Sequence, residues 1–391
     1  MVSEEDVRTR ELLQGAERAM RGRDARAALD LLREAEALAP GDAAVKMQLA
    51  LAFRALGDFP AALEAIDAAL VIDPYLLLAL LSKGWLLEKL GRAREAAAVY
   101  RNALKITPPD ARLSPALKAP VERAREAVRA DSEAAVAFVE ERLAEIRARH
   151  GGEDLKRFDI SRDAFLAGRK VYVPEPALLH YPMLPAEQFL DRRHFPWLEQ
   201  LEAATGTIRE ELLVVLREDL EQMEPYIQYP PGVPVNQWVE LNHSPRWNSY
   251  FLWKDGVKDE AHCARCPNTS ALLDALPLLR QSGFGPTAMF SVLAPRTHIP
   301  PHNGSTNTRC LVHLPLILPG PSRFRVGNET REWKMGEAWV FDDTIEHEAW
   351  NDADQTRVIL IADIWNPYLS EAERELVGAM MAAKNAFTAA G

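Results

Sequence analysis

Residues 297–318 read THIPPHNGSTNTRCLVHLPLIL, and this stretch indicates the fold of the C-terminal part of the 391-residue chain. His298 and His302 are four residues apart, a spacing that puts two zinc ligands on one face of a protease helix. Pro300 and Pro301 stand between them. Because proline has no N–H to donate and its ring clashes with the preceding turn, this segment is not a helix. The sequence therefore predicts an extended segment and excludes a zinc-protease helix.

Around this stretch, from about residue 235 onward, short runs rich in aromatic and β-branched residues follow one another. Turn residues such as Pro319-Gly320 and Gly327-Asn328 separate them. Strands of this length and spacing favour an antiparallel sandwich or barrel. Ser370-Glu371-Ala372-Glu373 has the form of a capping box, which predicts a closing helix. The predicted strands are residues 287–293, 311–318, 323–326, 337–341 and 357–364.

Two histidines of this region, His302 and His347, lie 45 residues apart and are candidate metal ligands. Imidazoles on different strands of a closed sandwich can converge on one ion. Non-haem iron oxygenases use two histidines and usually one carboxylate, which leaves positions open for cosubstrate and oxygen. The carboxylate usually follows the first histidine as His-x-Asp or His-x-Glu, but that position here is Gly304. By spacing alone, the carboxylate-based motif is broken.

Several motifs, in order and at matching spacings, resemble those of the aspartyl/asparaginyl β-hydroxylase family. The resemblance covers roughly residues 180–375. That family lacks the carboxylate ligand and has glycine in its place, so Gly304 fits the family pattern. Some members also join this domain to tetratricopeptide-like repeats. The motifs are Pro301–Arg309, Val312-His313-Leu314, Phe341–Glu348 and Ile364-Trp365-Asn366-Pro367.

The resemblance implies a double-stranded β-helix, or jelly-roll, fold that binds iron(II) (Fe²⁺) through His302 and His347. It also implies use of molecular oxygen (O2) and of 2-oxoglutarate as cosubstrate. The residues that match its 2-oxoglutarate positions are Ser291, His313 and Arg357. The chemistry agrees, because the planar fork of arginine binds a carboxylate bidentately and stays charged.

Two positions depart from the animal members, which carry basic residues near the acidic or amide side chain that they hydroxylate. The matching positions here are Met289 and Leu311, which offer no charge to an acidic substrate. Arg309 lies two residues before Leu311 and would face the same side of a strand. Arg309 is therefore a further ligand-binding candidate, for the cosubstrate or in compensation for the missing charge.

The first third of the chain repeats with a period of 34 residues. Ala28, Ala62 and Ala96 share this spacing, as do Pro40, Pro74 and Pro108. Small residues let the two helices of a hairpin approach closely, and proline ends the second helix. Over residues 6–109 the pattern resembles about three tetratricopeptide repeats, although Arg23 stands where later copies have Gly57 and Gly91. The repeats are either a concave surface for a peptide or protein partner, or a spacer or dimerisation device.

Three regions are predicted: a helical solenoid with a capping helix over residues 1–150, a connector over 151–200, and the jelly-roll domain over 201–391. Solenoid ends need a polar cap, which the pattern of residues 110–150 can supply. The connector is rich in proline between residues 170 and 200, which favours an extended path over the surface of the next domain. The predicted class is thus multidomain, α followed by β.

Composition limits the partners and the cellular location that are expected for the protein. The formal net charge of −11 disfavours general binding to nucleic acid. No signal peptide and no apolar run of membrane-spanning length is found, so a cytoplasmic protein without a membrane span is expected. The cysteines are Cys263, Cys266 and Cys310, too few for a disulfide framework. For Cys263 and Cys266, reduced thiols or a local crosslink are favoured over a metal site, because no second cysteine pair exists.

The function expected is hydroxylation of an unactivated C–H bond of a peptide, protein or amino-acid-derived substrate, with release of succinate and CO2. Three alternatives stay open. One is a non-catalytic cupin-like binding module, and another is a scaffold in which the repeats act and the β-domain is degenerate. The third is a halogenase, because glycine at the carboxylate position leaves room for chloride. The oligomeric state is not indicated by the sequence.

Overall fold

The computed structural model describes residues 4–281 and 283–389, and the chain divides into two compact units after Arg169. The division lies inside the predicted connector of residues 151–200, so this segment does not behave as one piece. Its first part is helical and belongs with the repeats, and its proline-rich part belongs with the β-domain. No helix in the described part of the chain is long and apolar enough to cross a bilayer.

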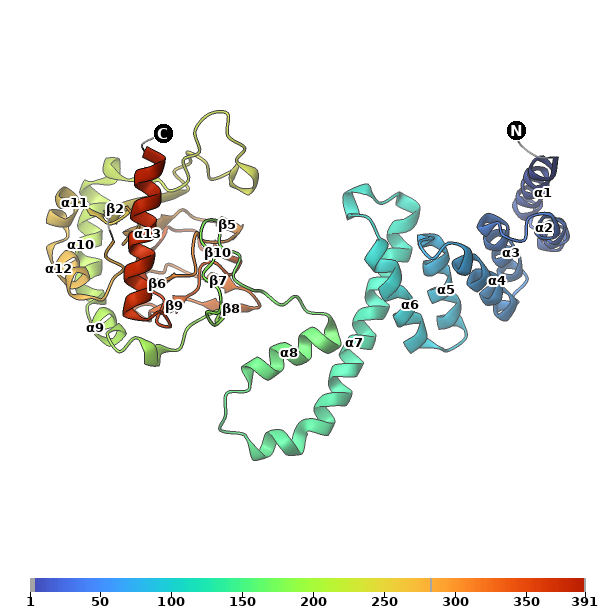
Figure 1. The fold of residues 1–391 in the computed structure, drawn as a ribbon, viewed down its shortest axis with the longest axis horizontal. Coiled ribbons are helices and arrows are strands. Elements are labelled where there is room, and N and C mark those ends of the chain that lie inside the picture. The colour runs from blue at the N-terminus through green and yellow to red at the C-terminus, as the bar shows by residue number, and fades with distance from the viewer. Residues whose placement is uncertain (1–3, 282, 390–391) are drawn as a thin grey trace. The chain divides into compact units, whose positions relative to one another are not determined.

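The N-terminal unit is built from helical hairpins, coloured blue to teal in Figure 1. The 34-residue period is explained by Ala28, Ala62 and Ala96, which are fully buried where paired helices approach most closely. Aspartates at the starts of α2, α3 and α4 cap these helices through their side chains. The paired helices are α1 (Glu4–Arg21) with α2 (Ala25–Leu38), α3 (Ala43–Ala55) with α4 (Phe59–Ile72), and α5 (Leu77–Lys89) with α6 (Ala93–Ile106).

The long helix α7 (Pro115–Arg149) covers the last hairpin. Val121 and Ala124 of α7 are buried in the same apolar cluster as the residues of α5 and α6. The rest of α7 is mostly polar, and α8 (Lys156–Ala167) packs against its second half through ion pairs such as Arg162 with Glu140. The helix predicted to cap the solenoid over residues 110–150 is therefore present, although it is longer than a cap requires.

The turn inside each hairpin uses a left-handed residue. Gly57 and Gly91 have φ values of 79° and 74°, and Arg23 adopts φ 62° at the matching position of the first copy. A side chain in this region costs roughly 1–2 kcal/mol, a cost that glycine avoids. The first repeat therefore accepts a backbone strain that the other two do not carry.

We predict that Gly57→Ala lowers the free energy of unfolding by about 1 kcal/mol, because only the backbone conformation penalises the new methyl group. A Cβ at Gly57 would meet nothing within 4 Å. Gly41→Ala is the matched control, since its Cβ also meets nothing and its φ lies outside the left-handed region. Urea unfolding followed by circular dichroism measures both, and equal losses in the two variants would contradict the explanation.

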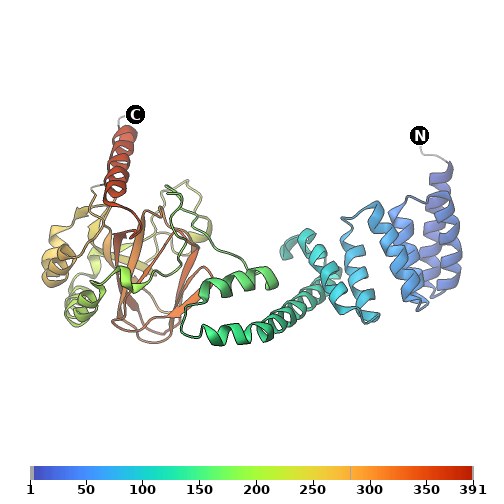
Figure 2. The same ribbon diagram turned by 60° about the horizontal axis from the view of Figure 1, so that its bottom comes forward.

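The C-terminal unit contains a sandwich of two antiparallel sheets (Figures 1 and 2). One sheet has the order β1-β2-β4-β11-β6-β9, with β3 paired to β2, and the other has the order β5-β10-β7-β8. Along the chain from β4 to β11 the strands pass back and forth between the sheets, apart from the hairpin β7–β8 within the smaller sheet, as in a jelly roll. The predicted fold class, a helical repeat unit followed by a β-sandwich, is confirmed.

The larger sheet consists of β1 (Glu224–Pro225), β2 (Trp247–Lys254), β3 (Val257–Lys258), β4 (Ala288–Leu293), β6 (Arg309–Ile317), β9 (Trp339–Phe341) and β11 (Arg357–Trp365). The smaller sheet consists of β5 (Thr297–His302), β7 (Ser322–Val326), β8 (Glu329–Glu332) and β10 (His347–Asn351). The remaining helices are α9 (Leu198–Ala203), α10 (Thr205–Glu218), α11 (Glu260–Arg265), α12 (Pro267–Ala275) and α13 (Glu371–Ala389).

Both faces of the larger sheet are buried. Even-numbered residues of β11, such as Val358 and Leu360, pack with α9 and α10 in one cluster. Odd-numbered residues, such as Ile359 and Ile361, face the smaller sheet in a second cluster with Phe324. The apolar run after Arg357 therefore reflects burial on both sides, and the alternation directs Arg357 into the space between the sheets.

The proline-rich segment after Lys170 takes an extended path along the β-domain, as its composition predicts. Its backbone N–H groups at Glu175 and Ala177 donate to the carbonyls of Thr344 and Gly304. The segment thereby supports the loop that follows β5 and the loop that follows β9. The capping box that starts α13 is also present, with Ser370 and Glu373 each accepting from the other's backbone N–H.

Candidate active site

The two candidate metal ligands face each other across an antiparallel strand pair. His302 ends β5, His347 begins β10, and the two are direct register partners. Side chains opposite each other in such a pair share one face of the sheet. Their ring centroids are 4.0 Å apart. The structure therefore brings together the two histidines that the sequence separates by 45 residues.

Backbone carbonyls orient both imidazole rings. Nδ1 of His302 lies 2.8 Å from the carbonyl oxygen of Pro300, and Nδ1 of His347 lies 3.1 Å from that of Ile345. Because a carbonyl only accepts, each Nδ1 must carry the proton and donate it. This leaves each Nε2 with a free lone pair, the arrangement of a histidine that binds a metal.

Both rings are neutral at physiological pH. Burial lowers the pKa of His302 to about 4. Burial also lowers the pKa of His347 well below its usual value, and the neighbouring His302 adds to the effect. A neutral imidazole is the form that coordinates a metal, so no proton competes for Nε2 at neutral pH.

Gly304 is in tight contact with Asp343. The Gly304 N–H donates to the Asp343 carbonyl, at 2.6 Å. A Cβ added at Gly304 would lie 2.0 Å from Oδ2 of Asp343, closer than any real contact. The carboxylate of Asp343 thus fills the space in which a third ligand of a His-x-Asp motif would begin. Any larger residue at this position would have to displace the Asp343 side chain.

The aspartates after β9, Asp342 and Asp343, form no hydrogen bond with His347, whose Nδ1 donates to Ile345 instead. Asp342 accepts from the backbone N–H and the hydroxyl of Thr344. Asp343 is 3% exposed, and its Oδ1 has no hydrogen-bond partner among the described residues. Burial raises the pKa of Asp343 to about 7. Within the described residues, no group of three His, Cys, Asp or Glu side chains is arranged for a metal.

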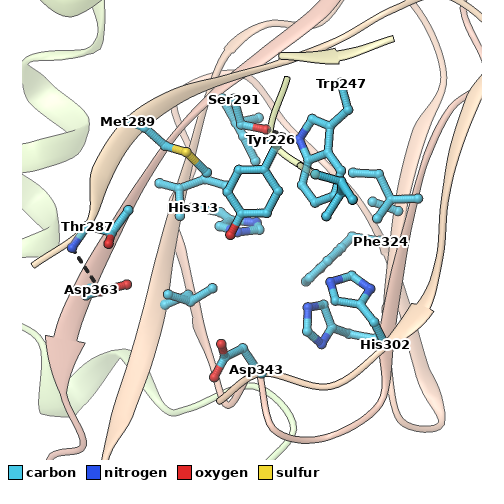
Figure 3. A pocket seen from close by; sticks show the side chains of 18 of the residues that line it. Tyr226, Trp247, Thr287, Met289, Ser291, His302, His313, Phe324, Asp343 and Asp363 are labelled. Atoms are coloured by element: carbon cyan, nitrogen blue, oxygen red, sulfur yellow. Dashed lines mark hydrogen bonds between the residues drawn. The ribbon is translucent and has the colours of Figure 1, made fainter. Parts of the chain in front are cut away.

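The three residues matched to 2-oxoglutarate binding lie on adjacent strands of the larger sheet. Ser291 is on β4, Arg357 on β11 and His313 on β6, and each is at most 5% exposed. All three line the cavity that His302 and His347 also line. The five residues that the sequence analysis selected therefore line one cavity of about 350 Å³. Figure 3 shows this cavity.

Arg357 has no carboxylate partner within the described residues. It is 1% exposed, its Nε and Nη1 make no hydrogen bond, and its guanidinium lies 4.5 Å from the centroid of the Trp333 ring. Burial lowers the pKa of Arg357 to about 9. An unpaired buried cation is costly, and a bound anion would offset that cost. Arg357 therefore indicates an anion site.

Other polar atoms near Arg357 are also unpartnered. Nδ1 of His313 and Nε1 of Trp333 are buried without a hydrogen bond. Burial and the adjacent Arg357 lower the pKa of His313 well below its usual value, so this ring is neutral. The Ser291 hydroxyl accepts from Nε1 of Trp247 at 3.0 Å, which leaves its own proton available for an anion. These groups suit an anionic ligand with several oxygen atoms.

Arg309 lies at the other end of the strand pair β6–β11. It is the register partner of Trp365, whereas Arg357 begins β11. Its Nη1 pairs with Oδ2 of Asp363 at 2.9 Å, and its Nη2 lies 3.8 Å from Oδ2 of Asp343. Arg309 does face the same side as Leu311, as expected, but its charge is engaged by carboxylates and is remote from the anion site at Arg357.

Several residues of the cavity were not identified from the sequence, among them Trp333, Tyr226, Asp255 and Asp363. Asp363 had a usable signal, because a carboxylate inside an apolar strand requires a buried partner. The others lie on loops or strand ends with no distinguishing pattern. Trp238 and Trp247 also line the cavity, whereas Trp253 packs on the opposite, helix-covered face of the sheet.

Cys263 and Cys266 form neither a disulfide nor a metal site. Both are buried free thiols. Burial raises the pKa of Cys266 to about 12 and also raises that of Cys263, so both stay protonated and unreactive. Of the two expected states, reduced thiols and a local crosslink, the structure has the free thiols.

Comparison with known proteins adds independent information. A family model described as aspartyl/asparaginyl beta-hydroxylase matches residues 202–367, and one described as tetratricopeptide repeat matches residues 78–110. The TPR domain of Arabidopsis OM64 is 27% identical and matches over 30% of this chain and 94% of its own, with a TM-score of 0.27 over the present chain.

Two curated relatives represent different named activities. The ornithine lipid ester-linked acyl 2-hydroxylase of Rhizobium tropici is 38% identical over 198 residues, which are 50% of this chain and 66% of the relative. The aspartyl/asparaginyl beta-hydroxylase of Mus musculus is 38% identical over 141 residues, which are 36% of this chain and 19% of the relative. The chain thus spans less than two thirds of either relative. Residues 202–367 therefore form a domain of the aspartyl/asparaginyl β-hydroxylase family, which this chain joins to tetratricopeptide repeats.

Proposed function

We propose that the protein is an iron(II)- and 2-oxoglutarate-dependent hydroxylase. The observation that carries the proposal is one cavity lined by two neutral histidines with free Nε2 atoms and by a buried arginine without an anionic partner. The first feature suits a divalent metal and the second suits a carboxylate. The relatives, which are named hydroxylases, support the same chemistry.

Different residues would bind the metal and the cosubstrate. His302 and His347 would hold iron(II) through Nε2, and Arg357 with the Ser291 hydroxyl would hold the far carboxylate of 2-oxoglutarate. Bound iron(II) supplies the redox chemistry that couples oxidation of 2-oxoglutarate to succinate and CO2 with hydroxylation of a C–H bond by O2. Apolar side chains such as Ile359 and Phe324 line the cavity and exclude water from that end. The two carbonyl-bound Nδ1 atoms keep the imidazoles in the metal-binding tautomer.

We further propose that the carbon to be hydroxylated belongs to an apolar part of the substrate. Met289 and Leu311 line the cavity, and neither offers a charge to an acidic side chain. An acidic group placed against them would lose its hydration without gaining a partner. The relative named as an acyl 2-hydroxylase of an ornithine lipid supports an apolar chain, whereas the relative named as an aspartyl/asparaginyl hydroxylase supports a peptide. Met289 and Leu311 favour the apolar chain over the acidic or amide side chain of a peptide.

The repeat unit is proposed to hold a peptide or protein partner, and a cytoplasmic location is proposed for the whole chain. These two statements rest on the presence of the repeats and on the composition.

Formation of succinate from 2-oxoglutarate tests the proposed function directly. Purified protein is expected to form succinate only when iron(II), 2-oxoglutarate and oxygen are all present. Many such oxygenases turn over slowly without their main substrate, so an assay over hours suffices. Absence of succinate, or undiminished formation when iron(II) is removed by a chelator, would overturn the proposal.

We predict that Gly304→Asp reduces activity, although it restores the spacing of an ordinary iron triad. Its Cβ would overlap the carboxylate of Asp343, so the loop after β5 must shift. Overpacking of this kind costs about 1–3 kcal/mol in stability. Gly304→Ala should lose the same amount of stability. The loss should be smaller when Asp343 is also replaced by serine. A large gain of turnover in Gly304→Asp would show that the site is a damaged ordinary triad.

A further inference from the structure

The end of the cavity remote from Arg357 is rich in carboxylates. Asp255, Asp343 and Asp363 line it, and Arg309 is the only cation there among the described residues. In Figure 3, Asp343 and Asp363 lie on the side of the cavity away from Ser291 and Trp247. The cavity is therefore electrostatically divided, with an unpaired cation at one end and an excess of carboxylates at the other.

Arg309 does not neutralise this end. It pairs with Asp363 and lies near Asp343, which leaves two carboxylates in excess when all three are ionised. Burial raises the pKa of Asp363, although Arg309 and the backbone N–H of Thr287 act in the opposite direction. A metal ion on the two histidines would balance Asp343, but Asp255 and Asp363 would still share one arginine.

A second observation points to a ligand at the same place. Oδ1 of Asp343 is buried, makes no hydrogen bond within the described residues, and belongs to a side chain that lines the cavity. The carboxylate of Asp255 is exposed at the turn between β2 and β3, and no described residue forms a hydrogen bond or ion pair with it. Buried and exposed acceptors thus line one cavity, in which Arg309 is the only cationic donor among the described residues.

The walls beside these carboxylates determine what else fits. Met289, Leu311 and Ile361 line the cavity and present only apolar atoms. The ring of Tyr226, which is 40% exposed, also lines it and offers an aromatic face to a cation. A ligand that satisfies both features has a positively charged group attached to an apolar chain.

We propose that the substrate carries an amine or other cationic group, which binds between Asp255 and Asp363 beside Tyr226, while its apolar chain extends along Met289 and Leu311 toward the two histidines. This inference rests on the proposed function for the location of the reacting carbon. The charge preference is opposite to that of the basic site expected for an acidic peptide side chain.

Calorimetric titration of the full chain with three probes of equal length tests the charge preference without any turnover. The probes are octylammonium, 1-octanol and octanoate, each below its micellar concentration. Octylammonium is expected to bind more tightly than 1-octanol. Octanoate is the control for the opposite end of the cavity, because its carboxylate can pair with Arg357. Added salt should weaken the binding of octylammonium and leave that of octanol unchanged, because screening acts only on the charged ligand.

Asp255→Asn is the informative variant, because asparagine tolerates the left-handed backbone of this residue, φ 51°. It should weaken binding of octylammonium roughly twofold to fivefold, the range for one partly exposed ion pair, and leave octanol unaffected. Glu221→Gln removes an equal charge from an exposed surface outside the cavity and should change neither.

Binding of octylammonium no tighter than that of 1-octanol in the wild-type protein, or an unchanged preference in Asp255→Asn, would overturn the inference. The result is distinguishable from that of the succinate assay, because ligand binding is measured without iron, oxygen or 2-oxoglutarate. Selective binding of octylammonium with no succinate formation would sustain the cation site and reject the proposed hydroxylase. Succinate formation with no such selectivity would do the reverse.

Discussion

Arg357→Ala is expected to weaken 2-oxoglutarate binding by roughly 10²–10³-fold. Arg357 is fully buried, and no described carboxylate pairs with it, so the cosubstrate would supply its missing partner. Removing one partner of a buried ion pair costs about 3–5 kcal/mol, and each 1.4 kcal/mol corresponds to about tenfold in affinity. Iron binding should be nearly unchanged, because Arg357 is not a ligand. Anaerobic titration of 2-oxoglutarate into the iron-loaded protein measures both quantities.

Substitution of lysine at two arginines provides the control. Arg357→Lys should restore only part of the affinity, because an ammonium cannot reproduce the two-pronged contact of a guanidinium. Arg309→Lys keeps a positive charge beside Asp363 and should leave 2-oxoglutarate affinity unchanged. A collapse of affinity in Arg309→Lys, with none in Arg357→Ala, would exchange the roles assigned to the two arginines.

His302→Ala and His347→Ala are each expected to abolish iron binding and succinate formation. The proposed ligands are these two histidines, so either loss leaves a single imidazole. A single imidazole binds a divalent ion too weakly to compete with water, so the loss of iron binding should be complete. Iron content after desalting and succinate formation are the two readouts.

His298→Ala is the matched control for the metal site. His298 lies on the same strand, but its Nε2 bonds to Glu348 and its ring stacks on Trp350, 4.9 Å away. This variant should keep both iron and activity. Retention of iron and turnover in both His302→Ala and His347→Ala would show that the metal site is elsewhere.

The architecture of the β-domain was largely predictable from sequence, because its signals are local. Pro300 and Pro301 exclude a helix around His302, and the strands expected over 311–318 and 357–364 agree with β6 and β11 within a few residues. The 34-residue period likewise predicted the hairpins, since each repeat buries the same alanine. In these cases one residue or one periodicity determines the local structure.

The less predictable features depend on contacts between distant segments. Nothing in the sequence indicates that the carboxylate of Asp343 fills the space beside Gly304, because the contact joins loops 39 residues apart. The pairing of Arg309 with Asp363 depends on the register of β6 against β11, which periodicity alone does not fix. The carboxylate-rich end of the cavity follows from that register and from loops that carry no motif.

Crystals grown without oxygen in the presence of manganese(II) and 2-oxoglutarate test the central claim most directly, because manganese replaces iron without turnover. The expected result is one metal ion bound by Nε2 of His302 and Nε2 of His347, with the far carboxylate of 2-oxoglutarate on Arg357 and Ser291. A metal ion bound by other residues, or a 2-oxoglutarate carboxylate paired with Arg309 while Arg357 stays without an anion, would contradict the account.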